Sequence, residues 1–178
     1  MKKIILSLLF LTGLSAYKAS AQMGAAQKVK WDVEKDAEIN MELDAVWEIF
    51  TNNELLKKAS DGYVNAIEVI DANMPASRKI VFSGGGNRTE NITQSEAHNK
   101  LIAISFSDST LPKGIKEAQY ALFFKANGSK TKVTWRALVS GDGDAKQALV
   151  KQLNAEFDSY AAGLDKMTKK SVPATKMN

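Results

Sequence analysis

Residues 117–140 read EAQYALFFKANGSKTKVTWRALVS, two alternating runs on either side of Asn127-Gly128. An Asn-Gly pair between such runs is the strongest short-range signal of a β-hairpin. Taking Asn127-Gly128 as a two-residue turn places Tyr120 opposite Trp135. The alternation then gathers five apolar side chains on one face of the hairpin: Tyr120, Leu122, Phe124, Val133 and Trp135. Such a face must be covered by another element.

The covering element is predicted just downstream. Six apolar residues recur at spacings of three and four, which is the stripe of a long amphipathic helix. They are Leu149, Leu153, Phe157, Tyr160, Leu164 and Met167. Asp144, followed three residues later by Gln147, matches the pattern of an N-terminal cap.

The segment before the hairpin reads as further strands interrupted by two short helices. Alternation and turn residues predict five strands, at 31–39, 63–70, 78–83, 88–95 and 101–107. Short helices are predicted over 44–50, with Asp44 as the cap, and over 54–59. The fold class is therefore α+β: a curved, seven-stranded antiparallel sheet wrapped on one long C-terminal helix, with two short helices after the first strand.

This order resembles the START-like helix-grip superfamily (SRPBCC), and within it the polyketide cyclase/dehydrase and lipid-transport group. The similarity covers about residues 31–167, and its clearest pieces are 42–50, 78–90, 131–136 and the closing helix near Gly163. The resemblance implies a pocket between the sheet and the long helix. It also implies a mouth formed by the turn at 84–86 and the loops at 109–116 and 141–143.

Strand parity indicates which side chains face that pocket. Ile102, Ile104 and Phe106 share a face with Glu90 and Ile92 if the preceding turn centres on His98. Arg78, Ile80 and Phe82 have the matching parity on their own strand. The candidate ligand-binding residues are Arg78, Ile80, Phe82, Glu90, Ile92, Ile104, Phe106, Tyr120, Leu122, Val133, Trp135 and Phe157.

Arg78, Glu90 and Tyr120 are the polar members of this set. A buried charge is costly unless it is paired, so Arg78 and Glu90 either satisfy each other or hold a polar group of a ligand. The alternative is that they lie at strand ends and reach solvent. Tyr120 either donates a hydrogen bond from its hydroxyl into a cavity or packs with that hydroxyl at the rim of the pocket.

No sequence motif identifies catalytic residues, and we predict neither a metal nor a cofactor. His98, the single histidine, lies in a predicted turn and is expected to be exposed. It supports neither a catalytic triad nor a zinc site. The Gly84-Gly85-Gly86 run lacks the Lys-Ser/Thr of a phosphate loop and precedes a strand. Asp142 and Asp144 lack the remaining ligands of a calcium loop.

The N-terminus has the features of a secretory signal. Lys2 and Lys3 precede an apolar run at 4–14, and Ala19-Ser20-Ala21 ends in the small residues at which signals are cleaved. We therefore expect a signal peptide at 1–21, a polar lead at 22–30, the helix-grip domain at 31–168 and a disordered tail at 169–178. The apolar run is too short to span a bilayer.

Composition supports an exported, soluble protein. Three of the 24 basic residues lie in the predicted signal, so the remaining 21 nearly balance 20 acidic residues, with a net charge of +1. Such a charge argues against a nucleic-acid partner. The chain has no cysteine, which excludes a lipid-modified N-terminal cysteine and disulfides. We expect a periplasmic or secreted protein that is not a lipoprotein and has no membrane span after signal cleavage, and we leave its oligomeric state open.

Three functions are compatible with these observations. The first is an exported binding protein for a small apolar or amphipathic ligand, such as a lipid, a polyketide-like molecule or an isoprenoid. The alternative is a protein-interaction module, which an interior filled by Trp135, Phe106 and Phe157 would favour. The second alternative is a cyclase/dehydrase-type enzyme, which Arg78, Glu90 and Tyr120 converging with perturbed protonation would favour.

Overall fold

The structure is a computed structural model that describes residues 29–171. The predicted signal peptide, most of the polar lead and residues 172–178 lie outside the described residues. The elements follow in the order β1 (Val33–Ile39), α1 (Leu43–Thr51), α2 (Asn53–Ala59), β2 (Val64–Asp71), β3 (Ala76–Phe82), β4 (Asn87–Glu96), β5 (Leu101–Phe106), a 3-10 turn (Asp108–Thr110), β6 (Ile115–Asn127), β7 (Lys130–Gly141) and α3 (Gly143–Ser171).

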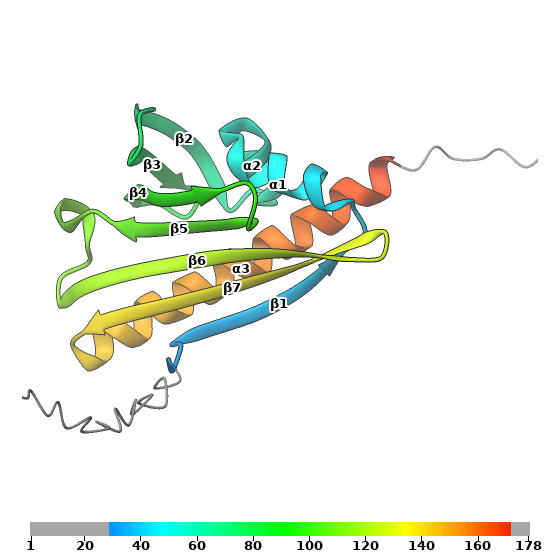
Figure 1. Ribbon diagram of the computed structural model, residues 1–178. Coiled ribbons are helices and arrows are strands. Elements are labelled where there is room, and N and C mark those ends of the chain that lie inside the picture. Colours follow the sequence, from blue (N-terminus) through cyan, green and yellow to red (C-terminus); the bar gives the residue numbers. More distant parts are fainter. Residues whose placement is uncertain (1–28, 172–178) are drawn as a thin grey trace, which may run out of the picture. The chain divides into compact units, whose positions relative to one another are not determined.

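The seven strands form one antiparallel sheet in the order β1-β7-β6-β5-β4-β3-β2. The sheet curves around α3, and α1 and α2 link the strands at its two edges, β1 and β2 (Figure 1). The helix-grip arrangement predicted from the sequence is confirmed. Because most of the strands bury alternate residues, the sheet has one apolar face, and α3 covers it.

The β6–β7 hairpin has a different register from the predicted one. Asn127 pairs with Lys130, so the two residues of the turn are Gly128 and Ser129, and Tyr120 lies opposite Ala137 instead of Trp135. The turn requires positive φ, and Gly128 supplies it with φ of 62°. The shift of two residues leaves every side chain on its predicted face, since side-chain direction repeats every second residue.

The two short helices begin at residues other than the predicted ones. Glu42 occupies the N-cap of α1 without a side-chain hydrogen bond, and Asp44 lies inside the first turn, so the prediction that Asp44 caps this helix is wrong. Asn52 caps α2, because its Oδ1 accepts the N–H groups of Glu54 at 3.0 Å and Leu55 at 3.2 Å.

Helix α3 begins at Gly143, so Asp144 lies in its first turn and is not the predicted cap. The helix continues to Ser171, and residues 169–171 are therefore helical where the sequence predicted a tail. Among the described residues, no helix has the length and apolarity needed to cross a membrane.

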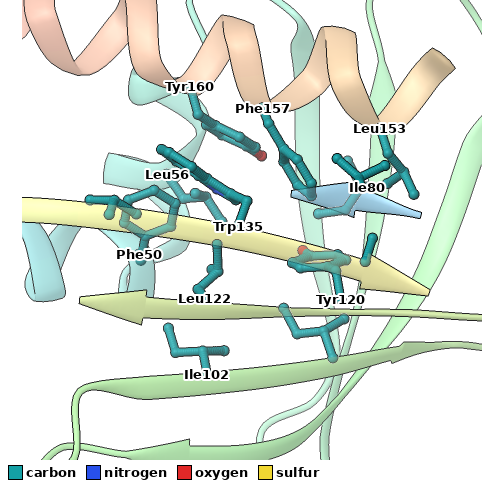
Figure 2. Packing of buried hydrophobic residues seen from close by; sticks show 14 of the residues in the cluster. Phe50, Leu56, Ile80, Ile102, Tyr120, Leu122, Trp135, Leu153, Phe157 and Tyr160 are labelled. Carbon is teal, nitrogen blue, oxygen red and sulfur yellow. The ribbon is translucent and has the colours of Figure 1, made fainter. Parts of the chain in front are cut away.

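The core lies between the sheet and α3. Leu153, Phe157 and Tyr160 of α3 point toward β7 and β6, where Trp135 and Tyr120 face them (Figure 2). Trp135 stacks on Phe157 with ring centroids 5.9 Å apart and an interplanar angle of 26°. These large rings fill the centre of the space in which the resemblance implies a pocket.

Candidate ligand-binding site

Four charged side chains meet in the interior between the sheet and α3. Arg78 lies on β3, Arg88 and Glu90 on β4, and Glu156 on α3. None of the four is more than 5% exposed. The β3–β4 register brings two of them together, because Arg78 pairs directly with Glu90.

Arg88 joins the two carboxylates. Its Nε and Nη2 donate to Glu90 Oε1 at 3.1 and 2.5 Å, and its Nη1 and Nη2 donate to Glu156 at 2.8 Å each. A guanidinium carries five N–H groups. Four of them are used in these bonds, and the fifth, on Nη1, has no acceptor among the described residues.

Glu90 is the centre of the cluster. Its Oε2 accepts from Arg78 Nε at 2.9 Å, and its Oε1 accepts from the Tyr120 hydroxyl, also at 2.9 Å. Burial alone would raise the pKa of Glu90, but the charges of Arg88 and Arg78 outweigh it and lower that pKa. Two arginines therefore balance two glutamates, which is how buried charges are tolerated.

Burial and the negative charge of Glu90 raise the pKa of Tyr120 well above its ordinary value. Tyr120 thus keeps its proton at neutral pH and donates a hydrogen bond to the ionised Glu90. The Tyr120 hydroxyl is buried and bonded to Glu90, so it occupies neither of the positions considered from the sequence, a cavity or a rim.

Aromatic rings enclose the Arg88 guanidinium. Its central carbon lies 4.4 Å from the ring centroid of Phe106 and 5.1 Å from that of Phe82. Stacking of this kind favours a cation and holds the guanidinium plane in place. The direction of its N–H groups is therefore fixed by both the rings and the two carboxylates.

A pocket of about 150 Å³ opens beside Arg88, between the sheet and α3. It has the turn residues Gly85 and Gly86 on one side and Thr110 and Pro112 on another. The remaining lining residues are Phe82, Asn87, Arg88, Phe106, Leu149 and Gln152. The mouth lies where two of the three predicted segments, 84–86 and 109–116, come together. The third predicted segment, 141–143, does not line this pocket.

Other hollows lie elsewhere on the described part of the domain. A pocket of about 90 Å³ near the C-terminus of α1 is lined by Arg78, Ile92 and five other residues. An open hollow of about 610 Å³ is lined largely by side chains that point away from the core, such as Asn91, Ser105 and Gln119. This hollow is not the predicted pocket, because it lies on the opposite face of the sheet from α3.

The predicted ligand-binding residues fall into three groups. Phe82 and Phe106 line the mouth pocket, and Arg78 and Ile92 line the pocket near α1. The others line neither pocket: Ile80, Glu90, Ile104, Tyr120, Leu122, Val133, Trp135 and Phe157. All eight are buried in the core.

Sequence reasoning missed Arg88 and Glu156. A signal for each was present: Arg88 shares the parity of Glu90, and Glu156 lies three residues after Leu153 on the apolar stripe of α3. His98 is exposed in the β4–β5 turn, as predicted. Within residues 29–171, no group of three or more histidines, cysteines or acidic residues is arranged to hold a metal ion.

The family model for polyketide cyclase / dehydrase and lipid transport matches residues 30–172, which include the whole of the predicted helix-grip domain. The chain belongs to this family. The resemblance noted from the sequence is thereby confirmed for the family and the fold. None of the curated proteins matches the chain significantly.

Several solved structures share the fold of this family member. The di-domain ARO/CYC BexL of the BE-7585A biosynthetic pathway superposes with a TM-score of 0.65 at 12% identity, over 77% of this chain and 46% of BexL, so the chain spans about half of that protein. Norcoclaurine synthase from Thalictrum flavum, in complex with dopamine and hydroxybenzaldehyde, gives 0.63 at 12% identity, over 79% of this chain and 87% of the synthase. Major latex-like protein 151 from Panax ginseng gives 0.65 at 12% identity, over 76% and 95%. At this identity the similarity shows the fold alone.

Proposed function

We propose that the protein binds a small amphipathic ligand in the mouth pocket between the sheet and α3. The observation that carries this proposal is Arg88, which lines the pocket and has one N–H group without an acceptor among the described residues. Phe82 and Phe106 add apolar walls. An oxygen of the ligand accepts a hydrogen bond from the spare N–H group of Arg88. The apolar part of the ligand packs on the rings of Phe82 and Phe106.

The pocket volume sets the size of what it holds. A cavity of about 150 Å³ is large enough for one benzene ring, and the mouth pocket has this volume. A ring-sized molecule, or one end of a longer polyketide-like or isoprenoid molecule, therefore fits. Norcoclaurine synthase, which shares the fold, is in complex with dopamine and hydroxybenzaldehyde, and this supports a ring-sized ligand.

Native mass spectrometry of protein purified from the cells that make it tests the proposal. We expect a co-purified small mass in the wild type. Gln152→Trp, which fills the pocket from α3, should lose that mass, whereas Lys151→Trp, on the exposed side of the same helix, should keep it. Ligand-free wild-type protein, or equal occupancy in the two variants, would contradict binding at the mouth.

A protein-interaction module is the second candidate, and the filled interior favours it. Trp135, Phe106 and Phe157 are at most 6% exposed and pack in one continuous aromatic cluster with Tyr120. If the same purification yields ligand-free protein, and small aromatic molecules leave its melting temperature unchanged, this candidate replaces the first.

Catalysis by Glu90 and Tyr120 is less favoured by the geometry. The two groups converge with Arg78, as an acid–base site would require, but neither lines the mouth pocket or the pocket near α1. The pKa of Glu90 is lowered and that of Tyr120 is raised. A general acid or base works best with a pKa near the operating pH, and both groups are shifted away from neutrality.

We also propose that the protein is exported to the periplasm or beyond and is soluble there. The support is the charged start, apolar run and Ala19-Ser20-Ala21 of the N-terminus. N-terminal sequencing of the mature protein should begin at Gln22. Ala19→Arg together with Ala21→Arg should block cleavage, and an intact Met1 terminus on wild-type protein from the cell envelope would contradict the proposal.

A further inference from the structure

Arg78 is a buried arginine with unused donors. It is 5% exposed, and its Nε donates to Glu90 Oε2 at 2.9 Å, while its Nη1 donates to Asn53 Oδ1 at 3.2 Å. A guanidinium has five N–H groups. The other three, including both on Nη2, have no acceptor among the described residues.

These donors are not sealed in the protein. Among the described side chains, Trp135 Nε1 is the fully enclosed nitrogen or oxygen that lacks a partner. Arg78 Nη2 also lacks one but is not fully enclosed, so it retains contact with open space. Arg78 lines the pocket of about 90 Å³ near α1, and we take this pocket as the open space beside its free donors.

The walls of this pocket are apolar, with two hydroxyls and no acidic residue. Phe50, Met74, Ile92 and Ile102 supply the apolar surface, and Thr51 and Ser95 supply the hydroxyls. No lining residue is shared with the mouth pocket. The pocket near α1 is therefore a separate location, and a ligand held there is additional to the one proposed for the mouth pocket.

The positive charge of Arg78 is only partly compensated. Among the described residues Glu90 is its one acidic partner, and Oε1 of that carboxylate is already engaged by Arg88 and Tyr120. Arg88, in contrast, also has Glu156. Within the neutral cluster, the excess of positive charge therefore lies at the Arg78 end, where the pocket opens.

We propose that this pocket binds a carboxylate, which pairs with the free N–H groups of Arg78. A planar carboxylate matches the fork of a guanidinium, and its single charge offsets the local excess. A phosphate dianion would bring a second charge into apolar walls without a partner. The carboxylate comes either from a small free acid or from the head group of a fatty acid, whose chain would leave the pocket along Met74, a lining residue that is 57% exposed.

Isothermal titration calorimetry at low ionic strength with acetate, octanoate and octanamide tests the proposal on full-length protein. We expect both carboxylates to bind and octanamide to bind at least about tenfold more weakly, since the hydrogen bonds to Arg78 are charge-assisted. Tighter binding of octanoate than of acetate identifies a fatty-acid head group, and equal binding identifies a small free acid. Octanamide binding as well as octanoate, or phosphate displacing acetate, overturns the carboxylate assignment.

Two pairs of variants locate the site. Ser95→Trp blocks the pocket without touching the ion cluster and should weaken carboxylate binding at least about tenfold. Ala97→Trp, in the exposed turn outside the pocket, should leave it unchanged. Arg78→Met removes the N–H donors and should abolish carboxylate binding. Arg78→Met combined with Glu90→Gln should do the same, and it leaves the opposite charges of Arg88 and Glu156 paired. Equal binding by Ser95→Trp and Ala97→Trp, or binding retained by either Arg78 variant, overturns the proposal.

Discussion

Arg88 and Glu156 form a two-pronged hydrogen-bonded ion pair, with both N–O distances at 2.8 Å, which ties β4 to α3 across the interior. Sheet and helix are thus joined by a directional polar contact as well as by apolar packing. The two residues are 68 positions apart in the sequence. The pair fixes how α3 lies over the sheet and holds Arg88 beside the mouth pocket.

The first prediction concerns this ion pair. Glu156→Gln should lower the free energy of unfolding by about 3–5 kcal/mol, because it removes one of the two carboxylates that pair with Arg88 and leaves the buried cluster with an uncompensated positive charge. Arg88→Met with Glu156→Met should lose less than the single variant, since Arg78 and Glu90 still balance. Urea unfolding measures both. Asp158→Asn, which affects an exposed pair with Lys35, is the control and should cost at most about 1 kcal/mol. A double variant less stable than Glu156→Gln would contradict this explanation.

The second prediction concerns acid stability. The pKa of Glu90 is lowered from the ordinary value of 4.5 by Arg88 and Arg78, against the opposing effect of burial. The unfolded chain therefore binds this proton at a higher pH than the folded chain does. The contribution of Glu90 is present above pH 4.5 and is lost as the pH falls below that value toward the folded pKa.

Urea unfolding measured at a series of pH values below 4.5 should show stability falling with acidification. Glu90→Gln should reduce this slope, whatever its absolute stability. Glu38→Gln, which removes an exposed carboxylate with a pKa lowered by Lys130, should change the slope less. An unaltered slope in Glu90→Gln would refute the prediction.

The third prediction concerns Gly163. A Cβ atom at this position would collide with the carbonyl of Ala59, so α3 approaches the end of α2 too closely for any side chain. Gly163→Ala should therefore destabilise the fold by about 1–3 kcal/mol or more, the cost of overpacking. In an unobstructed helix interior the same change stabilises by about 1 kcal/mol. Thermal unfolding shows whether Gly163→Ala lowers or raises the stability. At Gly143→Ala, where a Cβ meets nothing within 4 Å, little loss is expected.

The fourth prediction concerns the unpaired indole. Trp135 Nε1 is buried without a hydrogen-bond partner. Trp135→Phe removes this donor, and the relief of about 1–3 kcal/mol offsets much of the lost packing. Phe157→Leu loses the stacked ring without such relief and should be the more destabilising variant, as measured by urea unfolding. The opposite ranking would show that Nε1 is satisfied in solution.

The faces of the strands were predictable, but the exact pairing was not. The alternation in β6 and β7 placed Leu122, Val133 and Trp135 in the core, where they are found. The predicted hairpin register was wrong by two residues, because the turn uses Gly128-Ser129 instead of Asn127-Gly128. A pattern with period two does not distinguish registers that differ by two residues, so the core was correct while the pairs were not.

Only two of the four charged residues in the buried cluster were predicted from the sequence. Arg78 and Glu90 were identified because they interrupt apolar faces, and the β3–β4 register does pair them. The partnership of Arg88 with Glu156 depends on where α3 crosses the sheet. Strand parity contains no information about that crossing. The caps predicted at Asp44 and Asp144 were wrong for a local reason, since each helix starts one residue before the aspartate.

The sequence by itself determined the order of strands and helices and which faces are apolar, because these follow from periodicity along the chain. The family came from the resemblance of its segments, which the family model confirms. The tertiary structure alone decided that the interior holds large rings and a neutral cluster of four charges, with two small pockets that open onto arginines. Packing of distant segments sets the space that is left, and side-chain volumes fill it only once those segments are in contact.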